Sequence, residues 1–440
     1  MAAGPALAQA PLTLEALAAR LERLERQNAD LVEEVRRLRN EAGTVRAPAE
    51  PARLQALEEK LDLQAGRVAE QDQVKVESSQ RVPVRLTGMV LFNAFRNSRH
   101  GLGADNPITA SIAPGRANTG GTLRQSVVGL EFQGPEAVLG GKLRGSFLLD
   151  LFSGAGEALN QQVRLRTASI EAQWGSRGFL VGQEKPIFSP REPNSLAQVG
   201  VSPLTGAGNL WRWRPQARFE QRLDLGGAAQ LRARIGVSQT EERGQALDPA
   251  IDATLEPRRP ALEGHFQLTH RFDDQRRIEF APGFHISTTH VAGFNLPASA
   301  FSLDWFVNPH PRLEFTGMWF TGKNLAKLGA GGVRQGFSVF RPGTSQLLII
   351  PVRTRGGWAQ LTWVATSRLS FNLYGGQDDP NNRDLPAGGI GRNQAYAANV
   401  FYRLAPNVVV GWEVSQVRTR YLSGPRPLYN HYDLAVGYLF

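Results

Sequence analysis

The chain ends with the ten residues HYDLAVGYLF, His431 to Phe440, and this stretch decides the fold. Apolar side chains stand at every second position, and His431, Asp433, Ala435 and Gly437 stand between them. A repeat of two residues is the repeat of a β-strand with one apolar face. The last residues therefore predict a strand that runs to the end of the chain.

The same repeat extends back to Val82 and predicts sixteen strands. We expect them near 83–96, 122–133, 140–152, 162–174, 178–185, 209–223, 227–239, 260–271, 276–288, 298–307, 311–321, 354–366, 368–376, 394–404, 407–418 and 428–440. Tight turns such as 175–177 and 405–407 alternate with long loops at 97–121, 186–208, 240–259, 322–353 and 377–393. Strands of about 9–11 residues with this alternation are typical of outer-membrane barrels. We predict an all-β fold, a 16-stranded antiparallel transmembrane β-barrel over 82–440.

The final strand also predicts a partner. A terminal Phe440, preceded by Tyr438 and further apolar residues at alternate positions, resembles the signal read by the outer-membrane insertion machinery. An even strand number brings both barrel ends to the short-turn side, which faces the periplasm. The aromatic residues of the strands fit belts at the two surfaces of the lipid bilayer, and the alternative is that some of them are sugar platforms inside the pore: Trp319, Trp358, Trp363, Tyr396, Tyr402, Trp412 and Tyr438.

The N-terminal segment has a different period. Residues 1–10 resemble the end of a signal peptide or are a disordered start. From Leu14 to Leu38 apolar positions alternate in steps of three and four, interrupted by Asn28, and a weaker set spans 54–71. This heptad pattern predicts a helical coiled coil over 12–76 that stands in the periplasm and joins copies of the chain. We expect a homo-oligomer joined by this coiled coil and by contacts between barrel walls.

Charge is divided unevenly along the chain. The 440 residues carry 50 basic and 40 acidic side chains, with a formal charge of +10 and no cysteine. Residues 1–80 hold 11 basic and 14 acidic side chains, so the excess of positive charge belongs entirely to the predicted barrel. The missing cysteines exclude a disulfide scaffold and thiolate chemistry.

Strand alternation predicts where the basic residues of the barrel point. Charged side chains on the lipid face cost about 2–4 kcal/mol at the membrane centre, so we expect them to face the lumen. In the strand at 209–223, Trp211 and Trp213 share one face and the arginines share the other. The predicted lumen residues are Lys142, Arg144, Arg164, Arg166, Arg212, Arg214, Gln216, Arg218, Arg222, Arg232 and Arg234, and the long loop at 186–208 begins beside Lys185 and Arg191.

A lumen lined by arginine favours anions, because the field of the wall attracts them. The acidic lumen residues Asp150, Glu220, Glu279 and Glu413 offset part of this charge. The alternative is that the arginines pair with these carboxylates and only stabilise the wall.

The loop region resembles a known family, the DcaP-like porins. The resemblance rests on Gly182, Gln183, Phe188, Pro190 and Pro193, followed by Arg214-Pro215-Gln216-Ala217-Arg218-Phe219. It implies a trimeric sixteen-stranded channel for small anions such as dicarboxylates, with an N-terminal coiled coil. The sequence departs from the family pattern at Glu184-Lys185 and at Trp213, next to the expected constriction.

Other functions are less well supported by the sequence. Four histidines (His265, His270, His285 and His290) lack the ligand spacing of a zinc site, no G-x-S-x-G motif is present, and the basic residues form no continuous face for nucleic acid. We therefore expect no metal, no cofactor and no catalytic residue. Two alternatives remain: a carbohydrate-selective porin, and an envelope tether or adhesin whose coiled coil binds peptidoglycan.

Overall fold

The computed structural model describes residue 33 and the ranges 84–101, 104–153, 161–240, 256–331, 335–341 and 347–440. The predicted signal remnant at 1–10 and the predicted coiled coil at 12–76 lie outside these residues, apart from Glu33, which is helical. In the described part of the chain, no helix has the length and apolar character needed to cross a membrane.

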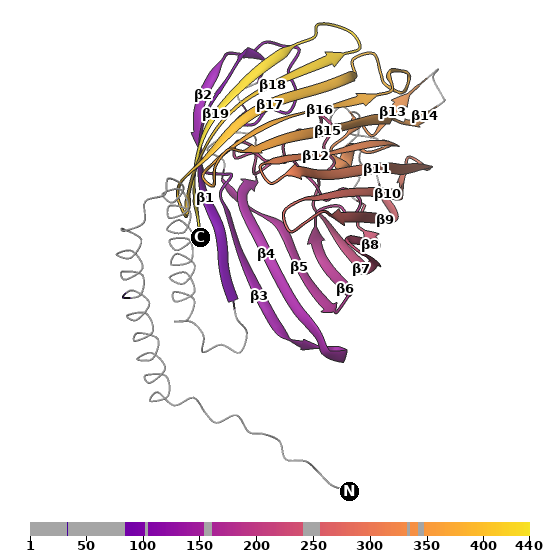
Figure 1. Ribbon diagram of the computed structural model, residues 1–440. Helices are drawn as coiled ribbons and strands as arrows, with labels where there is room; N and C mark the ends of the chain where they lie inside the picture. The colour runs from indigo at the N-terminus through magenta and orange to yellow at the C-terminus, as the bar shows by residue number, and fades with distance from the viewer. Residues whose placement is uncertain are drawn as a thin grey trace. The chain divides into compact units, whose positions relative to one another are not determined.

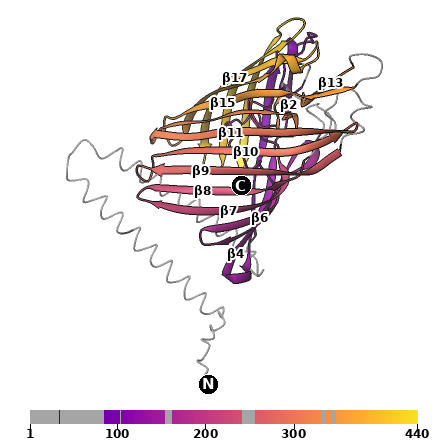
Figure 2. The same ribbon diagram turned by 90° about the vertical axis from the view of Figure 1, so that its right-hand side faces the viewer.

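The described strands form a closed antiparallel ring of sixteen, the predicted barrel (Figures 1 and 2). In order around the ring they are β1 (Val84–Asn97), β3 (Val127–Ala137), β4 (Gly141–Ser153), β5 (Gln162–Trp174), β6 (Arg177–Glu184), β7 (Arg214–Gly226), β8 (Ala229–Ser238), β9 (Glu256–Arg271), β10 (Arg277–Val291), β11 (Phe294–His310), β12 (Leu313–Lys323), β15 (Arg353–Val364), β16 (Leu369–Pro380), β17 (Ile390–Ala405), β18 (Val408–Tyr421) and β19 (Leu428–Leu439).

Three further strands and four short 3-10 helices belong to the connections. They are β2 (Asn118–Thr122), β13 (Phe337–Phe340), β14 (Leu348–Pro351), η1 (Arg99–Gly101), η2 (Val138–Gly140), η3 (Ala326–Leu328) and η4 (Asn382–Asp384). Strand β2 continues the line of β3 and pairs with the end of β1, whereas β13 and β14 form a separate hairpin.

The ring closes where β1 pairs with β19, over Met89↔Leu439 to Asn97↔His431. Beyond this ladder, Gly88 N donates to Phe440 O at 2.9 Å and Phe440 N donates to Gly88 O at 3.2 Å. A Cβ atom at Gly88 would lie 2.5 Å from Val127 O and 2.7 Å from the Phe440 ring. The Phe440 ring therefore packs directly against Gly88, and the ring of strands is closed as far as the last residue.

Burial alternates along the strands as the sequence predicts. Along β19, Tyr432, Leu434, Val436 and Tyr438 are exposed, whereas His431, Asp433 and Ala435 are buried. Exposed large apolar side chains recur in this way on strands all round the ring. Polar residues inside and apolar residues outside are the arrangement that a barrel wall in lipid requires.

Each of the sixteen predicted segments overlaps one ring strand, with bounds that differ by up to five residues, and three differences concern the interior or the connections. β7 begins at Arg214, five residues later than predicted, because Trp211 turns inward and is 6% exposed. Trp358, expected in an outer aromatic belt, is 3% exposed and packs inside the ring. Finally, β10 and β11 are joined by only Ala292 and Gly293, at the end where the other connections are long.

Gly88 provides a test of ring closure. We expect Gly88→Val to destabilise the folded barrel by about 1–3 kcal/mol, because the new side chain overlaps the Phe440 ring and the carbonyl of Val127. The heat-dependent shift in gel mobility and urea unfolding in detergent measure this. Gly388→Val is the control, since nothing lies within 4 Å of a Cβ atom there. Equal stability of the two variants would contradict the proposed role of Gly88.

Candidate functional site

The connection 185–213, between β6 and β7, folds into the ring and is held there by side-chain amides of the wall. Gln360 accepts from Asn194 N at 2.8 Å, Asn399 donates to Asn194 O at 2.9 Å, and Asn93 donates to Leu196 O at 2.9 Å. Gln125 both donates to Ala197 O and accepts from Val199 N. An amide carries a donor and an acceptor, so it can bind either group of a peptide.

Charged groups hold the start of the same loop. Arg191 binds Glu279 of β10 and Asp304 of β11, and Lys185 binds Glu192 within the loop. Burial raises the pKa of the Glu192 carboxyl, but Lys185, Ser202 and Arg166 more than offset this, and its pKa lies below the usual value. Both predicted loop cations, Lys185 and Arg191, are therefore neutralised by carboxylates.

Apolar side chains fill one side of the ring beneath the loops. The buried cluster includes Phe188, Leu204 and Leu210 of the 185–213 loop, Ala110 of the 98–117 connection, and Leu325 and Leu328 of the 324–352 connection. These pack on wall residues of β11, β12 and β15–β19, such as Phe320, Trp358 and Tyr429. Three connections and seven of the sixteen wall strands thus form a core inside the barrel.

The opposite side of the ring carries the arginines of β5, β7 and β8, which we call the arginine wall: Arg164, Arg166, Arg218, Arg222, Arg232 and Arg234. Asp150 binds Arg164 at 2.6 Å and lies 3.6 Å from Arg166. Glu220 binds Arg222, Arg232 and Arg234 at 2.9, 2.6 and 3.1 Å.

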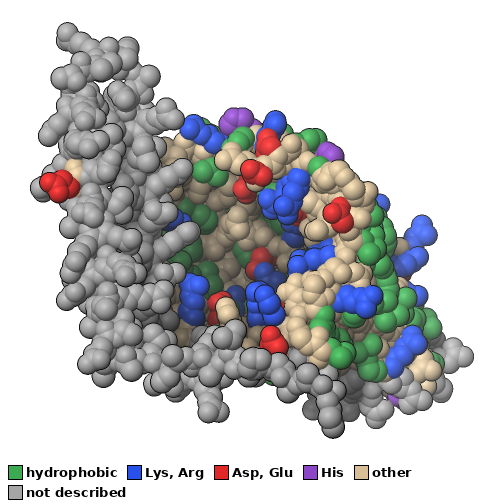
Figure 3. Space-filling model, turned by 60° about the horizontal axis from the view of Figure 1, so that its bottom comes forward, with side chains coloured by type: hydrophobic (Ala, Val, Ile, Leu, Met, Phe, Trp, Pro, Cys, Tyr) green, Lys and Arg blue, Asp and Glu red, His purple; other side chains and the backbone are tan. Residues whose placement is uncertain are grey.

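The arginine wall remains positive despite these pairs. Besides Asp150 and Glu220, the carboxylates of Glu171 and Glu184 are close enough to act on Arg218. With Glu192, which acts on Arg166 but also binds Lys185, six arginines face five carboxylates. Figure 3 shows Lys and Arg side chains gathered around a hollow of the molecule, with fewer acidic ones between them.

A β-bulge turns Arg166 inward. The register between β4 and β5 shifts between Leu148↔Thr167 and Leu149↔Leu165, so Arg166 is the extra residue. Gln183 of β6 donates to the carbonyls of Leu165 and Arg166, at 3.1 and 2.9 Å. Gly182 allows the close approach, since a Cβ atom there would lie 2.1 Å from Ala168 O. The Gly182-Gln183 pair therefore supports the bulge.

A cavity of about 390 Å³ lies between Arg166 and the 185–213 loop. Trp213, Glu192 and Asn194 line it together with Phe401. The guanidinium groups of Arg164 and Arg166 lie 5.0 and 4.7 Å from the Trp213 ring. Two nitrogens of Arg166, Nε and Nη1, have no hydrogen-bond partner in the described part of the chain. The partly buried guanidinium group of Arg166 thus lies beside a cavity that the loop restricts.

The remaining predicted site residues lie in several environments. Arg214 and Gln216 are buried on β7, and Gln216 donates to Lys185 O at 2.7 Å. Lys142 and Arg144 are exposed near the short-turn end of β4. Arg212 precedes β7, is exposed, and lies against Trp211, so it does not continue the series of Arg214 and Arg218. Phe188 belongs to the buried cluster, Pro193 is buried, and Pro215 is exposed.

Sequence reasoning missed two kinds of residue. One is the set of wall amides that bind the loop (Asn93, Gln125, Gln360 and Asn399). The other is Arg124, which is 2% exposed, lies 3.9 Å from the Phe152 ring and pairs with Asp105. Polar residues at inward strand positions were a signal for Asn93, Gln360 and Asn399, whereas Gln125 and Arg124 lie in the turn between β2 and β3.

Two of the histidines make buried contacts with carboxylates. His265 contacts Asp304 at 2.7 Å, and His285 contacts Glu263 at 2.9 Å, beneath the start of the 185–213 loop. No group of three or more potential metal ligands occurs in the part of the chain that the structure describes.

A closed sixteen-stranded ring with an inward loop and a charged wall defines a porin-like barrel. The chain is similar to the outer membrane channel DcaP of Acinetobacter baumannii, with a TM-score of 0.67 and 16% identity over 82% of this chain and 99% of that chain. It is also similar to an anion-selective porin from Comamonas acidovorans, with a TM-score of 0.54 and 10% identity over 82% of this chain and 100% of that one.

No protein-family model and no curated protein matches the sequence. At these identities the two solved structures establish the fold of the chain, that of outer-membrane porins. This agrees with the fold that the sequence resemblance implied.

Gln183 provides a test of the bulge. We expect Gln183→Ala to destabilise the barrel by about 1–3 kcal/mol, because the two carbonyls of the bulge lose their donor in a wall without water. Urea unfolding in detergent measures the loss. Gln173→Ala is the matched control, since its amide makes only a 3.4 Å contact with Gly175 O at an exposed turn. A Gln183 variant as stable as this control would show that the bulge does not need the amide.

Proposed function

We propose that the chain is a passive diffusion porin of the bacterial outer membrane that favours small anions such as dicarboxylates. The observation that carries the proposal is the excess of arginine over carboxylate on one side of the lumen, opposite the apolar cluster. No chemical step is involved, and the channel needs only a wall that attracts the solute and a restricted passage.

The physical basis is the low dielectric of the surrounding wall and lipid. Charges that line such a passage act on a solute more strongly than charges in bulk water, and they raise the local concentration of anions. Guanidinium groups also match the planar geometry of a carboxylate. A dicarboxylate can therefore exchange water for contacts with Arg166 and its neighbours and still leave, because each contact is shared with Asp150 or Glu220.

The proposal extends to assembly and orientation. The short turns would face the periplasm, where the heptads of residues 12–76 would join three copies, with barrel walls in contact. The aromatic chain end, Tyr438 and Phe440, would be read by the insertion machinery. Peptidoglycan is a candidate partner of the coiled coil.

A reversal-potential measurement tests the selectivity. In planar bilayers with a salt gradient we expect preference for anions, and we expect Arg164→Gln with Arg232→Gln to lower the anion-to-cation permeability ratio by about threefold. Asp150 and Glu220 each keep another arginine in this double variant, and because the bond from Arg164 to Gly200 O is also lost, heat-dependent gel mobility checks the folding. Arg355→Gln, which removes an exposed arginine, should leave the ratio unchanged.

Three other outcomes would contradict part or all of the proposal. A cation-selective wild-type channel would refute the proposal, and an unchanged ratio in the double variant would make these arginines structural. Block by maltodextrin without block by dicarboxylates would favour the carbohydrate-selective alternative. Against that alternative, the Trp213 ring already has Arg164 and Arg166 close to it.

Deleting residues 12–76 separates the channel from the tether. We expect the deletion to weaken trimers in native gels while single-channel conductance is kept, because the lumen is formed by the barrel. Loss of peptidoglycan co-sedimentation with unchanged conductance would give the coiled coil a tethering role of its own. Loss of conductance in correctly folded barrels would contradict a separate barrel channel.

A further inference from the structure

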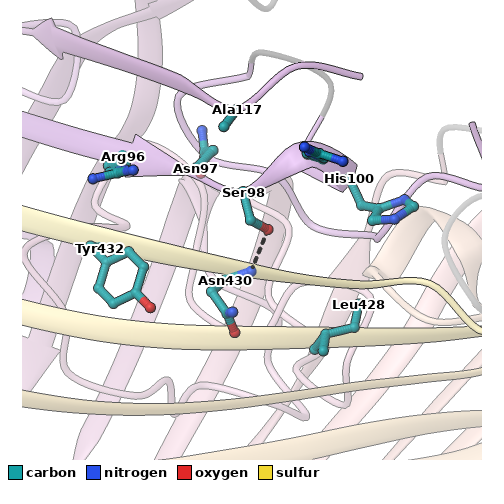
Figure 4. A pocket seen from close by; sticks show the side chains of 9 residues that line it. Arg96, Asn97, Ser98, His100, Ala117, Leu428, Asn430 and Tyr432 are labelled. Atoms are coloured by element: carbon teal, nitrogen blue, oxygen red, sulfur yellow. Dashed lines mark hydrogen bonds between the residues drawn. The ribbon is translucent and has the colours of Figure 1, made fainter. Parts of the chain in front are cut away.

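A groove of about 770 Å³ lies on the outside of the wall where β1 meets β19, at the long-loop end. Arg96 of β1, Arg99 and His100 of η1, and Leu428 and Tyr432 of β19 line it. Figure 4 shows Arg96 above Tyr432 at one end of the groove, and His100 above Leu428 at the other. The groove thus combines cationic and apolar side chains.

Strand register places the groove on the outer face. Arg96 is directly opposite Tyr432, and the preceding positions on the same face pair Phe92 with Val436. Phe92, Val436 and Tyr432 are all between 42% and 46% exposed. Along this seam the surface therefore changes from apolar to basic within one or two residue pairs, as it does where a barrel leaves the hydrocarbon layer.

Hydrogen bonds fix the residues around the groove. Ser98 N donates to Asn430 O at 3.0 Å, and Asn430 N donates to Ser98 Oγ at 2.9 Å, the bond drawn in Figure 4. The His100 ring is held by Ser111 O at 2.8 Å. Gln416 joins Asn430 to Arg418, an exposed arginine of β18 on the same face. A further cation thus borders the groove.

The positive charge of the groove is not offset locally. In the described ranges, no carboxylate forms an ion pair with Arg96, Arg99 or Arg418, although other exposed arginines at this end have such partners. Arg353 binds Asp384 at 2.8 Å, and Arg355 lies 3.6 Å from Asp379. The difference gives the groove a charge that an anion can compensate.

We propose that this groove binds the phosphate groups of an anionic lipid headgroup, with the acyl chains lying on the apolar wall below it. Arginine binds phosphate through two parallel N–H···O bonds, and basic residues at a membrane surface select anionic lipids. The lipid source is favoured over free phosphate because Phe92, Leu428, Tyr432 and Val436 continue the groove as an apolar surface. The inference rests on the proposed function only for the membrane location.

Lipid binding to the full-length protein tests the proposal. Native mass spectrometry in a neutral detergent, with increasing diphosphoryl lipid A, should give lipid adducts of the wild type. In Arg96→Gln with Arg99→Gln we expect binding at least about tenfold weaker. Arg353→Gln with Arg355→Gln is the matched control, with two exposed arginines removed at the same end, and should bind like the wild type. Heat-dependent gel mobility checks that both are folded.

Three results would overturn the proposal. Equal lipid binding by the two double variants would remove the groove from recognition. Complete competition by 10 mM inorganic phosphate would assign the site to a soluble anion. Dissociation of oligomers in the Arg96/Arg99 variant, without loss of lipid adducts, would make the groove a contact between copies. The reversal potential is measured separately, so a channel without anion preference that still binds lipid A leaves this inference standing.

Discussion

Every backbone donor and acceptor of a wall in lipid has to be bonded within the wall, and the rest of this structure depends on that constraint. Because of it, β1 has to pair with β19, and Phe440 has to bond with Gly88, so that the sheet has no unpaired edge strand. It also explains why Gln183 lies beside a bulge. The bulge turns Arg166 into the lumen, and the Gln183 amide donates to the carbonyls of Leu165 and Arg166 there.

The same constraint leaves the interior free to be polar. Because the backbone groups bond with one another in the strand ladder, the inward polar side chains need partners only among themselves, in the loops or in water. On one side they do so with amides such as Asn93 and Asn399, which bind the peptide groups of the 185–213 loop. On the other side arginines share Asp150 and Glu220. A loop and a charged surface thus face each other across the lumen.

The barrel and its inward face could be predicted from the sequence. A repeat of two residues indicates both that a segment is a strand and which of its side chains face inward. His431 to Phe440 already contained this information. The packing of the loops inside the barrel could not be predicted, because the residues of the loops follow no repeat. Trp211 and Trp213 continue the alternation of β7 in the sequence, yet both lie inside, where Trp211 packs in the loop and Trp213 lies near Arg166. Trp358 is different, because the alternation of β15 already places it on the inward face with Thr354, Gln360 and Thr362 and separates it from the exposed Trp363. Tertiary packing decided the positions of Trp211 and Trp213, which the alternation does not predict.

The apolar cluster on one side of the lumen has a consequence for how such a channel is altered. Phe188, Leu210 and Trp358 tie loop to wall, so changes among them disturb folding. Arg232 belongs to the opposite wall and pairs with Glu220, whereas Arg164 pairs with Asp150 and also donates to Gly200 O of the loop. In the proposed channel, stability and permeant choice would therefore depend on different sides of the barrel. The charge of the arginine wall could then be changed by substitution, one residue at a time, while the side with the apolar cluster is left unchanged.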